Sequence, residues 1–168
     1  LLLLGRMAPF WPIVLKAWKL DRSSNKAQFR KTCRLLEVYA FRGYGISNIP
    51  SDRGLPNLYG TARKFEGDFD ALHDHIASMC SWYNLNSRFT AGLDDPRLCI
   101  DKRHDALYLL WRYENSLRKK RGQRQPLLSW RDFVQPQTYS AKFSVEHIAA
   151  KESEIINTTI GLGFGSNL

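Results

Sequence analysis

The pair Glu146–His147, in the segment FSVEHIAAKESE at residues 143–154, has the clearest potential for chemistry. A neutral imidazole has a pKa of about 6.5, so His147 could accept a proton at neutral pH as a general base. The carboxylate of Glu146 offers the oxygen ligand that a hard divalent cation prefers. Adjacent Glu and His residues also occur at the surface end of a strand with no catalytic role, and the flanking segments must decide between these two interpretations.

The chain around this pair changes its periodicity after Pro126. Residues 143–147 alternate between apolar and polar side chains, which predicts a short strand. Because neighbouring side chains on a strand point to opposite faces, Glu146 and His147 can serve two partners only if the strand ends or bends near His147. The stretch TTIGLGFGSNL at residues 158–168 has three glycines within five residues, which predicts a loop.

Two segments of this region resemble a known nuclease motif, namely Val145-Glu146-His147-Ile148 and Gly165-Ser166-Asn167-Leu168. Together they are similar to the histidine-asparagine-histidine (HNH) motif in the C-terminal domain of GmrSD-type modification-dependent restriction endonucleases. That family has hydrophobic-Glu-His-Ile-x-Pro followed by Gly-Asn-Leu, whereas this chain has Ala150 in place of the proline and Ser166 in place of the glycine. The stretches RLLEVYAFRG and ALYLLWRYE, at residues 34–43 and 106–114, resemble the helical region that precedes the nuclease.

The resemblance implies a fragment of a metal-dependent DNA endonuclease of a restriction or phage-defence system, which hydrolyses phosphodiester bonds. In it, His147 would be the general base, Glu146 would bind Mg²⁺ or Mn²⁺, and Asn167 would orient the imidazole. Residues 126–168 would then form a small ββα-metal element, which we expect to be incomplete because the helix with the last motif residue would follow Leu168. The family's nucleotide-hydrolysing domain, with its Asp-Gly-Gln-Gln-Arg motif, is not in these residues, so an NTPase or sensor domain or subunit is an expected partner.

The residues before this element, 1–125, have mainly helical periodicity, so the sequence predicts a mainly α fold with a helical, basic domain that links to the nuclease and contacts DNA. Helices are expected over residues 8–20, 25–42, 67–83 and 103–121. Ser23 or Ser24 is the expected cap of the second helix, and Asp101 that of the last. The stretch GYGISNIPSDRGLPN, at residues 43–57, contains three Gly and two Pro and predicts a loop.

Apolar side chains at helical spacing predict which face of each helix is buried. The expected stripes are Phe29, Cys33, Leu36 and Ala40 in the second helix, Phe69, Leu72, Ile76, Met79 and Tyr83 in the third, and Leu107, Leu110, Trp111 and Leu117 in the last. Glu114 falls within the last stripe, and a buried carboxylate is costly unless it is paired. We therefore expect Glu114 to pair with an arginine such as Arg112 or Arg118, or with another segment.

The net charge of +9 favours a polyanionic partner, and it is unevenly distributed. Residues 1–66 hold 12 Lys and Arg against 4 Asp and Glu, whereas residues 67–100 hold 2 against 5. Two cationic sets could contact the backbone of double-stranded DNA, namely Lys26, Arg30 and Arg34 on one helix, and Arg118, Lys119, Lys120, Arg121 and Arg124 before the motif. Each set could equally be the solvated face or the solvated end of a helix.

Other features limit the interpretation. Three cysteines without a metal-binding pair suit a reducing, cytoplasmic compartment, and no run approaches the roughly 20 apolar residues of a membrane span. His73 and His75 would point about 200° apart on a helix, so they cannot share one ion. Besides the endonuclease, two hypotheses stay open: a basic nucleic-acid-binding or interaction module with a degenerate nuclease remnant, and a helical interaction domain whose charge is incidental.

Overall fold

The structure is a computed structural model that describes residues 4–50, 52–83, 85–122 and 129–130. Within these ranges every regular element is a helix, so the prediction of a mainly α body is confirmed for them. The chain order is η2 (Ala8–Phe10), α1 (Trp11–Leu20), α2 (Ala27–Ala40), η3 (Phe41–Ile46), α3 (Leu55–Lys64), α4 (Phe69–Trp82), α5 (Leu85–Leu93), α6 (Leu98–Asp101) and α7 (Arg103–Lys120). The boundary at residue 125 lies outside the described residues, and so does the expected ββα element except for residues 129–130.

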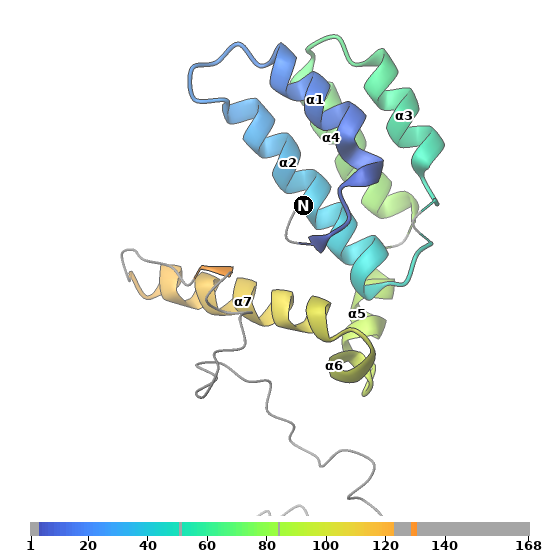
Figure 1. Cartoon of the computed structure of the whole chain (residues 1–168), viewed down its shortest axis with the longest axis vertical. Coiled ribbons are helices and arrows are strands. Elements are labelled where there is room, and N and C mark those ends of the chain that lie inside the picture. The colour runs from blue at the N-terminus through green and yellow to red at the C-terminus, as the bar shows by residue number, and fades with distance from the viewer. Residues whose placement is uncertain (1–3, 51, 84, 123–128, 131–168) are drawn as a thin grey trace, which may run out of the picture.

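The first four α-helices form a bundle, and α7 crosses below it (Figure 1). Helix α1 packs against α2 and α3, and α2 packs against α4. The interior is filled by side chains from all four helices, including Ile13, Leu36, Leu58, Ile76 and Met79, none of which is accessible to solvent. Burial of such side chains contributes about 1.5–3 kcal/mol each to the stability of the fold.

The start of α2 is fixed by Asp21 rather than by a serine cap alone. The Oδ2 of Asp21 accepts the backbone N–H of Phe29 at 2.9 Å, and its Oδ1 accepts the N–H of Ser23 at 2.9 Å. These hydrogen bonds lower the pKa of Asp21 to about 2. The predicted Ser23 does contribute, since its Oγ accepts the N–H of Ala27 at 3.2 Å. Three side chains, those of Asp21, Ser23 and Asn25, therefore accept from N–H groups of the first turn that have no partner within the helix.

The prediction of a loop over residues 43–57 is wrong at both ends of this range. Helix α2 continues directly into η3, a π-helical turn that contains Gly43 and Gly45, and α3 begins at Leu55. Gly45 instead allows close packing, because a Cβ there would lie 3.1 Å from Oδ1 of Asp105. A Cβ on Gly43 would make only an ordinary contact, 3.6 Å from the Leu85 side chain.

The predicted third helix is confirmed as α4, where Leu72, Ile76 and Met79 are buried. Its N-cap is Asp68, whose carboxylate accepts the N–H of Ala71 at 3.0 Å. A turn at residues 96–97 follows α5, a helix that the sequence pattern did not predict.

The last predicted helix is confirmed as α7, but two details differ from the prediction. Asp101 does not cap it, because this residue belongs to α6 and pairs with Arg97 at 3.1 Å. The buried residues are four consecutive ones near its start, Asp105, Ala106, Leu107 and Tyr108, while Leu110 of the predicted stripe is 42% exposed. Asp105 can be buried there because its carboxylate is paired with Arg6.

We expect Gly92→Ala to destabilise the protein by about 1–3 kcal/mol, because a well-packed site resists an added methyl group. A Cβ there would lie 2.7 Å from both the carbonyl oxygen and Cγ2 of Ile46. The matched control is Gly60→Ala in α3, where a Cβ meets no atom within 4 Å. This change should stabilise by about 0.5–1 kcal/mol through helix propensity. Chemical denaturation measures both, and a Gly92→Ala variant as stable as the parent would contradict the packing of α5 on η3.

Candidate nucleic-acid interface

The three predicted nuclease residues, Glu146, His147 and Asn167, lie outside the described residues, and so does Arg124. Their roles stay predictions. The other cations proposed to contact DNA are all described, and they fall into three environments: a structural contact, an ion pair and open solvent.

Lys26 has a structural position. It is the residue before α2, in a left-handed conformation with φ of 51°, and it is not part of the helical row. Its Nζ donates to the carbonyl oxygens of Trp18, at 3.3 Å, and Asp21. The same ammonium lies 4.9 Å from the centroid of the Trp18 ring. Lys26 therefore holds the α1–α2 connection together, and the cationic row on α2 begins at Arg30.

Arg30 and Arg34 are exposed on α2, and Lys31 is exposed beside them. Seven residues are nearly two helical turns, so Arg30 lies on the same side of α2 as Glu37. Glu37 faces α7: it accepts a hydrogen bond from the Tyr108 hydroxyl and lies 3.5 Å from Nη1 of Arg112. The row Arg30–Arg34 therefore extends along the side of α2 on which α7 packs.

The basic end of α7 contains one paired cation and three exposed ones. Nε of Arg118 donates to Oε1 of Glu114 at 2.7 Å, which confirms the predicted pair for Glu114. Lys119, Lys120 and Arg121 are exposed. Lys119 is seven residues beyond Arg112 and so lies on the α2-facing side of the helix. Cations in the last turn are also favoured by the helix dipole.

Together α2 and α7 form two diverging arms. They meet where Glu37 contacts Tyr108 and Arg112, and from there the N-terminal end of α2 and the C-terminal end of α7 separate (Figure 1). We call Arg30, Lys31 and Arg34 the α2 row and Lys119, Lys120 and Arg121 the α7 end. Near the meeting point, burial and the hydrogen bond to Glu37 raise the pKa of Tyr108, so this hydroxyl stays protonated and donating.

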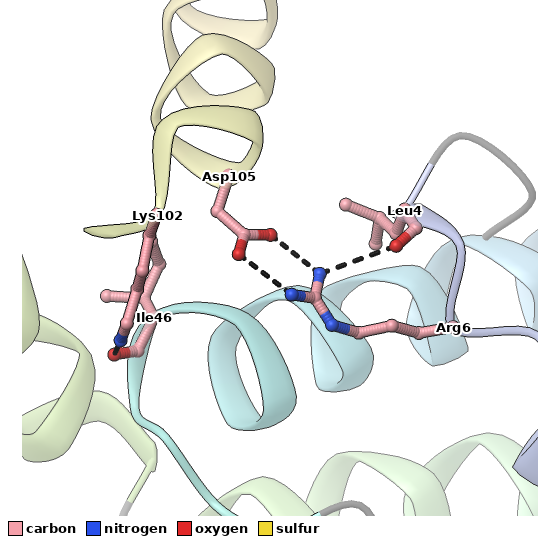
Figure 2. A network of polar contacts seen from close by, with 5 residues as sticks. All are labelled: Leu4, Arg6, Ile46, Lys102 and Asp105. Atoms are coloured by element: carbon pink, nitrogen blue, oxygen red, sulfur yellow. Dashed lines mark hydrogen bonds and ion pairs between the residues drawn. The ribbon is translucent and has the colours of Figure 1, made fainter. Parts of the chain in front are cut away.

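The start of α7 is fixed by a polar network that the sequence analysis missed (Figure 2). Nη1 and Nη2 of Arg6 contact the two carboxylate oxygens of Asp105 at 2.6 and 2.8 Å. Lys102 donates from Nζ to the Ile46 carbonyl oxygen at 2.7 Å, and desolvation lowers its pKa. The sequence offered two signals of this network: an acid, Asp105, near the start of an amphipathic helix, and a cation, Arg6, in an otherwise apolar N-terminal segment. Nothing local links these two residues, because they are far apart in the sequence.

The two central histidines have separate surroundings. His73 is buried, with Nε2 3.0 Å from the Thr32 hydroxyl, and desolvation lowers its pKa. His75 packs against Trp82 with ring centroids 5.2 Å apart. In the described part of the chain, no group of three or more His, Cys, Asp or Glu side chains could hold a metal ion. None of the helices described is both long and apolar enough to span a membrane.

Comparison with known proteins found no matching protein-family model, no matching curated protein and no matching solved structure. The resemblance to GmrSD-type endonucleases therefore stays a prediction from the sequence, carried chiefly by residues 145–168.

We expect Arg6→Ala to cost about 2–3 kcal/mol, because it leaves the buried Asp105 carboxylate without its main partner. The Asp105 side chain is 6% exposed and that of Arg6 is 28% exposed. Adding Asp105→Asn to Arg6→Ala should recover part of this loss, since a neutral amide is less costly to bury. Lys16→Ala is the control, because its partner Glu66 is 83% exposed and such pairs contribute about 0–1 kcal/mol. If the effects of Arg6→Ala and Asp105→Asn on the denaturation midpoint simply add in the double variant, the two side chains are not a coupled pair.

Proposed function

We propose that this chain is part of a metal-dependent DNA endonuclease of a restriction or phage-defence system, in which the helical body holds duplex DNA beside an HNH-like element at residues 126–168. The observation that carries the proposal is the position of the exposed cations. The α2 row and the α7 end lie on two arms that diverge from one contact, and the α7 end directly precedes the segment with the Glu-His motif. Exposed Arg and Lys side chains supply the phosphate contacts that dominate affinity for DNA.

A second observation links the motif segment to α7. The ring of Trp130 packs against Tyr108 and Trp111, with centroids 5.6 and 5.4 Å apart. Residue 130 therefore lies against that helix. An HNH-like element that continues from Trp130 would begin against the same helix that carries the basic end.

In the proposed reaction, His147 takes a proton from the attacking water, and Asn167 orients the imidazole for that step. Glu146 offers a carboxylate oxygen, a donor that fits Mg²⁺ or Mn²⁺. When bound, the ion would supply Lewis-acid stabilisation of charge on the phosphate and the leaving oxygen. The three residues are close in type to the family's motif, which is why these roles are assigned to them.

A second candidate function is binding without cleavage. Ala150 and Ser166 depart from the family's motif, and the cationic arms do not depend on an intact nuclease. Such a protein would be a basic DNA-binding module with a degenerate nuclease remnant. The two candidates share the DNA-binding prediction and differ only in the cleavage prediction, so the following two experiments separate them.

For DNA binding, we expect reversal of Arg30 and Arg34 to Glu, or of Lys119 and Lys120 to Glu, to weaken binding of a duplex of any sequence. Each lost phosphate contact should reduce the log–log salt slope by about 0.9. The matched control reverses Arg53 and Arg88, two exposed arginines outside α2 and α7. Titration at several salt concentrations measures the slopes. Equal losses in all three double variants would mean that only net charge matters and that the arms form no binding surface.

For cleavage, we expect His147→Ala to reduce metal-dependent nicking of plasmid DNA by about 10² to 10⁴ while duplex binding is retained, because only the general base is removed. Glu146→Gln should weaken metal affinity, so raised Mg²⁺ or Mn²⁺ should restore part of its activity. Asn167→Ala should give an intermediate loss. Duplex binding by the unaltered protein without nicking of the plasmid would favour the degenerate module.

A further inference from the structure

Helix α1 presents a line of large apolar side chains to solvent. Trp11 is 45% exposed, Leu15 is 58% exposed and Trp18 is 54% exposed. Spacings of four and three residues put all three on one side of the helix. The opposite side is the one that packs in the bundle, with Ile13 and Ala17 fully buried. The exposed line, which we call the α1 stripe, is therefore not required for packing of the bundle.

The indole of Trp18 is held in place although more than half of it is exposed. The Phe29 ring meets it at a centroid distance of 5.1 Å and an interplanar angle of 78°. The Lys26 ammonium lies 4.9 Å from its centroid and is itself fixed by two backbone carbonyl oxygens. A ring that is already oriented loses little conformational entropy when a ligand stacks on it.

The segment of chain that contains the α1 stripe is mostly positive, although the Glu66 carboxylate lies 3.3 Å from Nζ of Lys16 on α1. Residues 1–36 contain eight Lys and Arg and one acid, Asp21, which is buried with its carboxylate bound to Ser23 and to the Phe29 N–H. Lys19 and Arg22 are exposed at the end of α1, and the α2 row begins one residue after Phe29. Exposed indoles interleaved with cations are complementary to a polyanion whose flat apolar groups are accessible.

We propose that the α1 stripe binds a single strand of DNA, with Trp11 and Trp18 stacking on bases and Lys19 and Arg22 contacting phosphates. In a duplex the bases stack on one another and are closed to an indole, whereas an unpaired strand offers them. The two tryptophans are separated by about 10 Å along the helix, which spans roughly three stacked nucleotides. This inference rests on the proposed function, because the single strand would come from DNA that the same chain binds.

The experiment uses the full 168-residue chain and a labelled oligothymidylate of about 12 nucleotides, a length within the range of single-strand sites. Trp11→Ala and Trp18→Ala should each weaken binding by about 5- to 100-fold, the loss of one stacked base. Trp18→Phe should retain most of the affinity, because it keeps an aromatic ring. Trp82→Ala is the matched control, since Trp82 is 56% exposed on α4, away from the α1 stripe, and its loss should leave binding unchanged.

A second probe separates stacking from charge. An abasic oligonucleotide of the same length keeps the phosphates but has no bases, so it should bind more weakly and should not respond to the tryptophan substitutions. Losses of equal size on the abasic strand, or unchanged oligothymidylate binding in both alanine variants, would overturn the proposal. Tighter binding of oligouridylate would reassign the strand to RNA.

Two further arms test other occupants. Leu15→Ala should have little effect on the oligonucleotide, because an aliphatic side chain is not a stacking platform. Vesicles containing phosphatidylserine test for a lipid-binding face. If they bind the unaltered chain but not the Trp11→Ala and Leu15→Ala variants, while both variants still bind oligothymidylate normally, the stripe binds lipid and the proposal fails. Failure of the endonuclease proposal is read separately, from duplex binding by the α2-row variants and from nicking by the His147 variant.

Discussion

The close approach of backbones at the turn η3 determines where the second half of the described chain sits. The Ile46 carbonyl lies so near Gly92 that no side chain fits between them, and Gly45 lies directly against the Asp105 carboxylate. The same Ile46 oxygen accepts a hydrogen bond from the Lys102 ammonium. Helices α5 and α7 are thus both held by one turn of six residues. A π-helical turn at the end of α2 is wider than an α-helical turn, and insertions of this kind often occur at functional positions.

The position of α7 matters because its two ends have different roles. At the N-terminal end, Asp105 is bound by Arg6, and this pair ties α7 to the start of the chain. At the C-terminal end, the exposed cations extend away from the bundle (Figure 1). Because both arms are positive, they repel each other at low salt, and the contact of Glu37 with Tyr108 and Arg112 supplies the opposing negative charge where the arms meet. A bound polyanion would lower this repulsion along the whole length of both arms.

The sequence predicted those elements whose pattern is local. Helix α4 and helix α7 were predicted from amphipathic periodicity. A partner for Glu114 was predicted because this carboxylate falls within an apolar stripe, and of the partners left open the structure shows Arg118. The loop predicted over η3 was wrong because a glycine needed for close packing and a glycine needed for a turn are indistinguishable in the sequence. The pair Arg6–Asp105 could not be predicted either, because long-range partners depend on how the helices pack. The nuclease residues lie outside the described part, so that half of the candidate site still rests on the motif.

Helix α2 connects the two surfaces that are proposed to contact DNA. Just before and within its first turn, Lys26 and Phe29 hold Trp18 of the α1 stripe, and the following turns carry Arg30 and Arg34. Neither contact distinguishes one base from another: an indole stacks on any base, and a guanidinium on the outside of a helix meets phosphates of any sequence. If both proposals hold, the two surfaces would distinguish paired from unpaired DNA, because only the α1 stripe needs accessible bases. On these proposals the helical body senses the strandedness of its DNA, and any preference for a sequence or a modified base must come from another part of the protein or from a partner.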